Sequence, residues 1–243
     1  MWRQLSRFVF FLLSILWFSL WPAAAAVLQP ETLFYLVEAP MFKNAGRAVI
    51  SLRSVGVGLY EGAIRGETSG AVALFSGHRR DHYRTTMRLS QGKLQPLLYV
   101  EESWVRHKHL YKEYRFDYEQ GRLEMWRREP SGELVRKWEA ELTEPFYDPI
   151  SAFYNFRIGG FGELKGGETL SVSGIPYPRP ERIVIHLGPQ EPGNRRATVT
   201  IRQRSFDNEI GLVHVQFDDN LIPLSAWTRV LFFGKLAGRL VGR

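Results

Sequence analysis

From residue 33 onward, apolar and polar side chains alternate over short stretches, which glycine, proline and aspartate separate at intervals of about ten residues. Residues 83–89 show the alternation clearly: odd positions hold tyrosine, threonine, methionine and leucine, and even positions hold arginine and threonine. A period of two places one kind of side chain on each face of a β-strand. The pattern therefore predicts antiparallel strands joined by short turns.

The clearest hairpin is predicted between residues 114 and 126, where aromatic and charged residues alternate on both sides of a turn at 119–121. Proline-containing segments at 176–180 and 189–194 are predicted to be connections, because proline cannot donate a ladder hydrogen bond. Later strands are predicted at 169–174, 182–187, 197–206, 212–218, 223–233 and 235–241.

Residues 148–157 depart from the strand pattern and predict one short helix. Asp148 is placed as an N-cap, Pro149 occupies the first helical position, and Gly159 and Gly160 follow as a stop. Apolar residues recur at helical spacing within the segment, so one face of the helix should press on the sheet.

The same helix is the candidate ligand site. Its caps are explained by helix stability alone, since Arg157 at the C-terminal end complements the helix dipole. Three roles are possible for the helix: a purely structural element, a lid over an apolar hollow, or a plug in it. The candidate lid or plug residues are Asp148, Ile150, Phe153, Tyr154, Phe156 and Arg157.

Residues 27–243 show no internal repeat and no long linker, which predicts a single antiparallel β domain. About a dozen strands without helices on both faces must curve to hide their apolar side, because a flat open sheet exposes a face and its edges. We therefore predict a mostly β fold: one large curved antiparallel sheet, half-barrel or barrel-like, with one short helix.

The first 26 residues have the three parts of a secretory signal peptide. Arg3 and Arg7 precede an apolar run at 8–21, and small residues follow up to Ala26, where cleavage is expected. The run is shorter than the roughly 20 residues that span a bilayer. We therefore expect a periplasmic protein, and the absence of cysteine means that it is not a lipoprotein.

The composition and the motifs argue against catalysis. The chain is 44% hydrophobic, enough to bury a core, but it contains no cysteine for a disulfide, a thiolate zinc site or a nucleophile. No serine lies in a glycine-flanked elbow. Adjacent carboxylates such as Asp218 and Asp219 face opposite sides of a strand. We expect a non-enzymatic protein without a cofactor.

Two pairs of histidines are candidate metal ligands. His78 and His82 share a face, as do His107 and His109, but closed metal sites need three or four ligands. Arginine and lysine flank both pairs and would repel a cation. We therefore predict no metal site.

The formal net charge is +7, and basic residues gather in the first half of the chain, interleaved with aromatic ones. Neighbouring glutamates also fit a solvated outer face that needs no ligand. As an alternative, the cations would contact an anionic head group or membrane surface. The candidate anion-contacting residues are Arg84, Arg88, Arg106, Lys108 and Arg115.

Three segments, at 43–48, 147–157 and 217–224, together resemble an exported bacterial family catalogued as domain of unknown function 3108. The most specific is the central one, with the pattern Asp-Pro-x-Ser-Ala-x-Tyr-x-x-Arg at 148–157. The resemblance implies a periplasmic or surface-associated β protein with no established activity and no named catalytic residue. Members look like half-barrel carriers of lipoproteins and lipids, an analogy of fold alone.

These features favour a periplasmic binding or carrier protein for an apolar or amphipathic envelope molecule with an anionic head group, with peripheral membrane contact. Two alternatives stay open: an accessory protein of envelope or polysaccharide assembly that binds another protein, and an outer-membrane β-barrel. Nucleic acid is not expected as a partner, because export places envelope lipids and polysaccharides, which carry the same charge, next to the arginines.

Overall fold

The computed structural model describes residues 28–162, 164–175, 180–189, 191, 193–202, 210–230 and 234–243. The predicted signal peptide, most of the first proline-containing connection, and the ends of the strands predicted at 197–206 and 223–233 lie outside the described residues. No helix in these ranges is long and apolar enough to cross a membrane.

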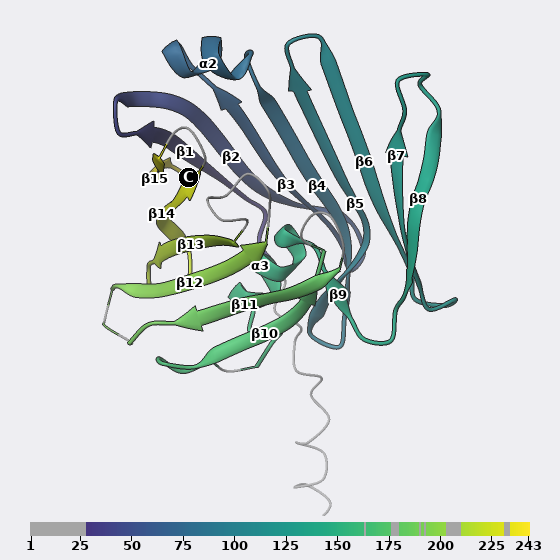
Figure 1. The fold of residues 1–243 in the computed structure, drawn as a ribbon. Coiled ribbons are helices and arrows are strands. Elements are labelled where there is room, and N and C mark those ends of the chain that lie inside the picture. Colours follow the sequence, from purple (N-terminus) through teal and green to yellow (C-terminus); the bar gives the residue numbers. More distant parts are fainter. Residues whose placement is uncertain are drawn as a thin grey trace, which may run out of the picture.

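Within the described residues, fifteen strands form one sheet, accompanied by two helices (Figure 1). The strands are β1 (Glu31–Ala39), β2 (Phe42–Gly56), β3 (Leu59–Thr68), β4 (Arg80–Ser90), β5 (Lys93–Val105), β6 (Lys108–Asp117), β7 (Arg122–Arg128), β8 (Leu134–Glu141), β9 (Phe146–Tyr147), β10 (Thr169–Gly174), β11 (Glu181–Leu187), β12 (Arg195–Arg202), β13 (Ile210–Phe217), β14 (Pro223–Val230) and β15 (Gly234–Gly242). The helices are α2 (Gly70–Ser76) and α3 (Pro149–Arg157). The predicted large curved sheet is confirmed.

The sheet consists of two meanders joined at one seam. Strands β1 to β8 follow one another in space, as do β10 to β15, and β1 pairs with β15 to connect the two halves. All pairs are antiparallel except β9 with β10, a parallel contact that the sequence pattern does not predict. Strands β8 and β9 are the two edges, so the sheet is not closed.

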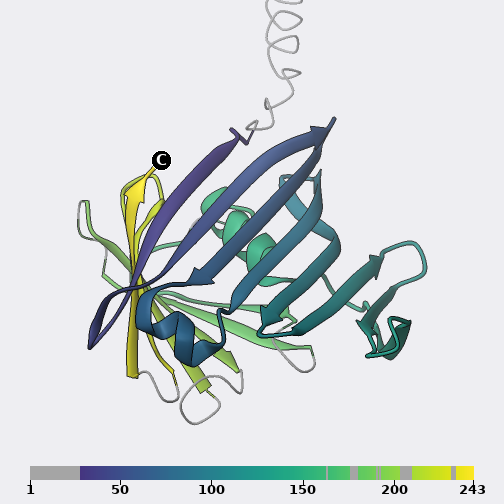
Figure 2. The same cartoon turned by 90° about the horizontal axis from the view of Figure 1, so that it is seen from above.

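Helix α3 lies inside the curve of the sheet, between the two halves (Figures 1 and 2). Ile150 and Tyr154 belong to the hydrophobic cluster of the N-terminal half, and Phe156 belongs to that of the C-terminal half. The helix lies so close to β3 that a Cβ atom on Gly62 would approach Ile150 to 2.5 Å. The side chains of one helix therefore contribute to the hydrophobic cores of both halves.

The alternation predicted for 83–89 is confirmed. Thr85 and Met87 are fully buried on the concave face of β4, whereas Arg84 and Arg88 are exposed on the convex face. The sequence pattern does not predict helix α2, because two of its large apolar residues, Leu74 and Phe75, point into solvent rather than into the core. The sequence pattern thus predicts one helix, whereas the described residues contain two.

Two buried polar side chains fix α3 to the sheet. The carboxylate of Asp148 accepts the backbone N–H groups of Ile150 (2.9 Å) and Ser151 (3.1 Å), as an N-cap, and the hydroxyl of Thr85 (3.0 Å). The Asn155 amide donates to the carbonyl of Leu94 (2.8 Å) and accepts its N–H (2.9 Å). Leu94 precedes the part of β5 that pairs with β6, so Asn155 takes the place of a strand partner there.

Replacing Asp148 by alanine is expected to lower the free energy of unfolding by about 2–4 kcal/mol, because the cap is lost and the Thr85 hydroxyl loses its acceptor. Burial raises the pKa of Asp148, so the stability from this group is greatest below the unfolded pKa of about 4 and is lost as pH rises through the folded value.

Asp148→Asn keeps the capping oxygen but does not titrate. Its stability relative to the wild type should therefore increase as pH rises above the unfolded pKa of about 4, as measured by urea unfolding at a series of pH values. A difference in the free energy of unfolding between Asp148→Asn and wild type that is the same at every pH would contradict the raised pKa of Asp148.

Candidate ligand-binding cleft

A cleft of about 460 Å³ lies at the C-terminal end of α3, between this helix and the C-terminal half of the sheet. This volume lies within the range of small-molecule sites. Its apolar lining is formed by Phe156, Ile158, Leu164, Leu187, Phe217 and Leu221. Three arginines, Arg157, Arg195 and Arg196, also line it. The cleft thus combines an apolar surface with cationic groups.

Two sequence segments more than fifty residues apart meet at this cleft. The last turn of α3 supplies Phe156, the end of β13 supplies Phe217, and their ring centroids lie 5.5 Å apart. The turn after β13 is held by Asp218, whose carboxylate accepts the backbone N–H groups of Asn220 and Ile222. This turn places Leu221, with φ of 57°, at the cleft.

Arg195 and Arg196 are only loosely held. Arg195 lies 4.0 Å from Asp219, and Arg196 lies 4.0 Å from Glu191, and the four side chains are 41–65% exposed. Exposed ion pairs at this distance contribute little free energy. Arg195 lies on the same face of β12 as the buried Ala197, so its guanidinium group can turn toward an anion in the cleft at little cost. Arg196, which also donates to Asn194 (3.3 Å), lies on the opposite face of the strand.

Arg157 has a different role, because it is committed to Glu31. The side chain of Arg157 is 14% exposed and that of Glu31 is 19% exposed. The guanidinium group donates to both carboxylate oxygens of Glu31, which makes the ion pair bidentate. The guanidinium also lies over the rings of Phe153 (5.4 Å) and Tyr154 (5.7 Å). The pair ties the end of α3 to the start of β1.

The same region contains the seam between the two halves of the sheet. The hydroxyl of Tyr35 on β1 donates to the carbonyl of Pro223 on β14 (2.8 Å), and Arg243 donates to Asp218 (2.9 Å). Burial raises the pKa of Tyr35, so its hydroxyl stays protonated and can donate. The cleft is therefore built against the contacts that join the N- and C-terminal halves.

The structure does not bring the five predicted anion-contacting residues into one site, and none of them lines the cleft. Arg84 and Arg88 lie on the convex face of β4, because the concave positions of this strand hold its core residues. Arg115 is committed to Glu113 and lies 4.6 Å above the ring of Trp126. Arg106 and Lys108 lie at the β5–β6 hairpin, on the rim of the sheet.

The histidines combine differently from the sequence pairs. His82 and His109 both face Glu102, at 3.9 and 3.5 Å. Burial, Arg65 and Arg84 lower the pKa of His82, which favours the neutral ring. Among the described residues, no group of three or more histidine, aspartate or glutamate side chains is arranged to hold a metal ion.

The fold and the cleft define an open, strongly curved β-sheet protein with a helix packed inside the curve. Residues 33–191 match the family described as "Protein of unknown function (DUF3108)". This match covers more than half of the chain, so the protein belongs to that family. Of the three segments that carry the resemblance, the one at 217–224 lies beyond the matched residues.

The fold has a counterpart among solved structures. The crystal structure of a "Beta-barrel-like Protein of Domain of Unknown Function DUF1849 from Brucella abortus" is similar, with a TM-score of 0.53 and 14% sequence identity over 87% of this chain and 95% of the other. At this identity the likeness shows the fold alone. No curated protein matches the chain.

Arg157→Met is expected to destabilise the fold by about 3 kcal/mol, because it leaves the Glu31 carboxylate buried without its cation. Adding Glu31→Gln should recover part of this loss. The matched control is Arg182→Met, whose ion pair with Glu144 joins side chains that are about half exposed, and which should cost less than about 1 kcal/mol. Equal losses for the two single variants in urea unfolding would refute the role of Arg157.

Proposed function

We propose that the protein is a non-enzymatic, periplasmic binding or carrier protein that holds an amphipathic envelope molecule with an anionic head group in the cleft at the end of α3. The observation that carries this proposal is the composition of the cleft: an apolar lining with a loosely held arginine, Arg195, beside it. Export by the predicted signal peptide is part of the proposal.

The cleft has an apolar part and a cationic part, and each contacts a different part of the ligand. The ligand's apolar part packs on Phe156, Phe217 and Leu221, and each buried methylene contributes about 0.8 kcal/mol. Its anionic head group meets Arg195, which presents planar donors suited to carboxylate or phosphate oxygens. The affinity then comes mainly from the apolar part of the ligand, and the preference for an anion comes from Arg195.

The position of α3 bears on where the ligand binds. The hollow that a half-barrel carrier would offer is filled by the helix, which packs on both halves of the sheet. A ligand in the cleft contacts the exposed end of α3 and does not require the helix to leave. We therefore place the ligand at the end of the helix rather than behind it.

The described lining also favours binding over chemistry. The lining residues are phenylalanine, leucine, isoleucine, glycine, proline and arginine, and none of these residue types is a usual nucleophile or general base. This supports a binding role for the cleft.

The proposal is tested with a dansyl-labelled fatty acid, whose fluorescence rises in an apolar site, on protein purified without detergent. Leu164→Trp should fill the cleft and abolish the signal. Arg195→Gln should weaken binding of the fatty acid about tenfold, equivalent to about 1.4 kcal/mol, and should change displacement by an uncharged monoacylglycerol much less.

The matched control for the charge change is Arg84→Gln/Arg88→Gln, which removes two exposed arginines from the convex face of β4. This variant should bind the probe as the wild type does. Wild-type affinity in both the Leu164→Trp and the Arg195→Gln proteins would show that the probe binds elsewhere and would overturn the proposal.

A further inference from the structure

Helix α2 exposes large apolar side chains at the rim of the sheet. Val72 and Ala73 are buried, but Leu74 is 68% and Phe75 is 73% exposed. Figures 1 and 2 place α2 beside the β1–β2 turn, where Met41 is 87% exposed. An apolar group of this kind on a folded surface marks a contact with a partner or a membrane.

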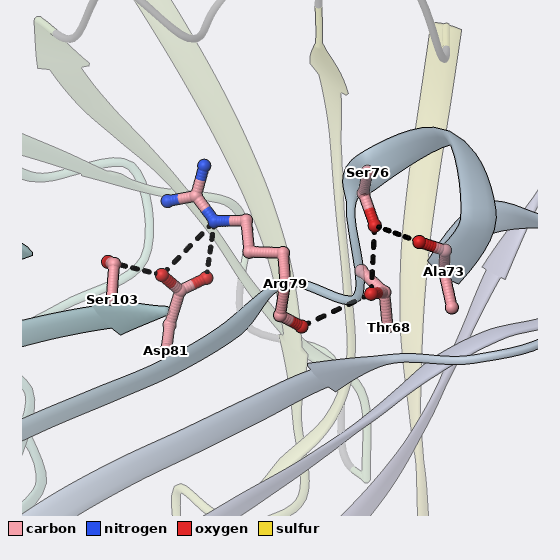
Figure 3. A network of polar contacts seen from close by, with 6 residues as sticks. All are labelled: Thr68, Ala73, Ser76, Arg79, Asp81 and Ser103. Atoms are coloured by element: carbon pink, nitrogen blue, oxygen red, sulfur yellow. Dashed lines mark hydrogen bonds and ion pairs between the residues drawn. The ribbon is translucent and has the colours of Figure 1, made fainter. Parts of the chain in front are cut away.

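The helix is held firmly in this position at its N-terminal end. The backbone N–H of Ser69 donates to the carbonyl of Ala45 (2.9 Å), and its hydroxyl donates to the carbonyl of Asn44 (2.9 Å). Ser76 donates to the hydroxyl of Thr68 (2.9 Å), which donates in turn to the carbonyl of Arg79 (Figure 3). These contacts fix the start of α2 to β2 and its last residue to β3.

The C-terminal end of α2 is fixed to the β5–β6 hairpin. The backbone N–H of Arg106 donates to the carbonyl of Gly77 (2.8 Å). Gly77 has φ of 69°, and a Cβ atom there would lie 2.5 Å from the side chain of Arg106. Because α2 cannot simply turn inward, Leu74 and Phe75 stay exposed in the folded protein.

Cations flank the apolar residues at both ends of the helix. Lys43 precedes Asn44, which contacts the start of α2, and Arg106 and Lys108 lie at the hairpin that contacts its end. All three side chains are exposed. None of them makes an ion pair with another described residue, so their charges are available to an external anion.

We infer that this rim, consisting of Met41, Leu74, Phe75, Lys43, Arg106 and Lys108, docks on the surface of an anionic phospholipid bilayer. Leu74 and Phe75 enter the boundary between head groups and acyl chains, and the three cations lie at the level of the anionic head groups. The charge beside the apolar residues favours an anionic bilayer over an apolar protein surface, which would have to desolvate these cations.

The rim is separate from the cleft. The end of β3 that leads into α2 pairs with Gly46 of β2, whereas Glu31, the partner of Arg157 at the cleft, pairs with Leu52 further along the same strand. Docking through the rim therefore leaves the cleft free, and the two proposals fail independently.

Sedimentation with vesicles tests the inference on the exported protein without the predicted signal peptide, whose apolar run at 8–21 would itself bind vesicles. Vesicles of phosphatidylglycerol and phosphatidylethanolamine should bind the wild type at least about tenfold more tightly than phosphatidylcholine vesicles. Leu74→Ser/Phe75→Ser should weaken binding about tenfold or more, because two apolar side chains no longer enter the interface. The matched control is Val55→Ser/Val57→Ser, which changes two exposed apolar residues near the β2–β3 turn and should bind as the wild type does.

The charge contribution has its own control. Lys43→Gln/Lys108→Gln should remove most of the preference for anionic vesicles, whereas Arg88→Gln/Lys93→Gln, at exposed positions toward the β4–β5 turn, should retain it. Loss of anionic preference in both pairs would show that net charge, and not the rim, directs binding, and would overturn the inference.

Insertion can be observed directly, because the chain has no cysteine. An environment-sensitive dye on Phe75→Cys should brighten and shift to the blue with anionic vesicles, and the same dye on Val57→Cys should not. An unchanged signal at Phe75→Cys, or capture of a protein by a photo-crosslinker at this position without vesicle binding, would overturn the inference. Leu74→Ser/Phe75→Ser should bind the dansyl-labelled fatty acid normally, which keeps this test distinct from that of the cleft.

Discussion

The sheet does not close, so its apolar concave face must be covered for the fold to be stable. Helix α3 provides the cover for both halves at once, since Ile150 and Tyr154 pack on one half and Phe156 on the other. A helix of this length is marginal by itself, and packing on two sides gives it its stability. The buried contacts of Asp148 and Asn155 then fix where along the sheet it lies.

The cleft follows from the same arrangement. The helix ends at Arg157, and the space beyond its last turn is bounded by Phe217 and Leu221. The Arg157–Glu31 ion pair holds this end against the seam. The position of the cleft is thus set by the length of α3 and by the pairing of β1 with β15.

Sequence alone predicts the features that depend on neighbouring residues. The alternation around Met87 assigns both faces of β4, and Asp148 with Pro149 marks the start of α3. Features that depend on long-range pairing are not predictable in this way. Arg195 reaches the cleft only because β12 pairs with β13 at Phe217, and Arg84 lies outside it because β4 presents its arginines to the convex face.

The most direct test of the central claim, that the cleft holds an amphipathic anion, is native mass spectrometry of the protein purified from its own cells without detergent, with lipid extraction of the same sample. The account predicts a bound species near one per protein that the extract identifies as an anionic amphipath. It also predicts loss of this species when Leu164→Trp fills the cleft. A mass equal to that of the polypeptide alone, with no lipid in the extract, would contradict the account.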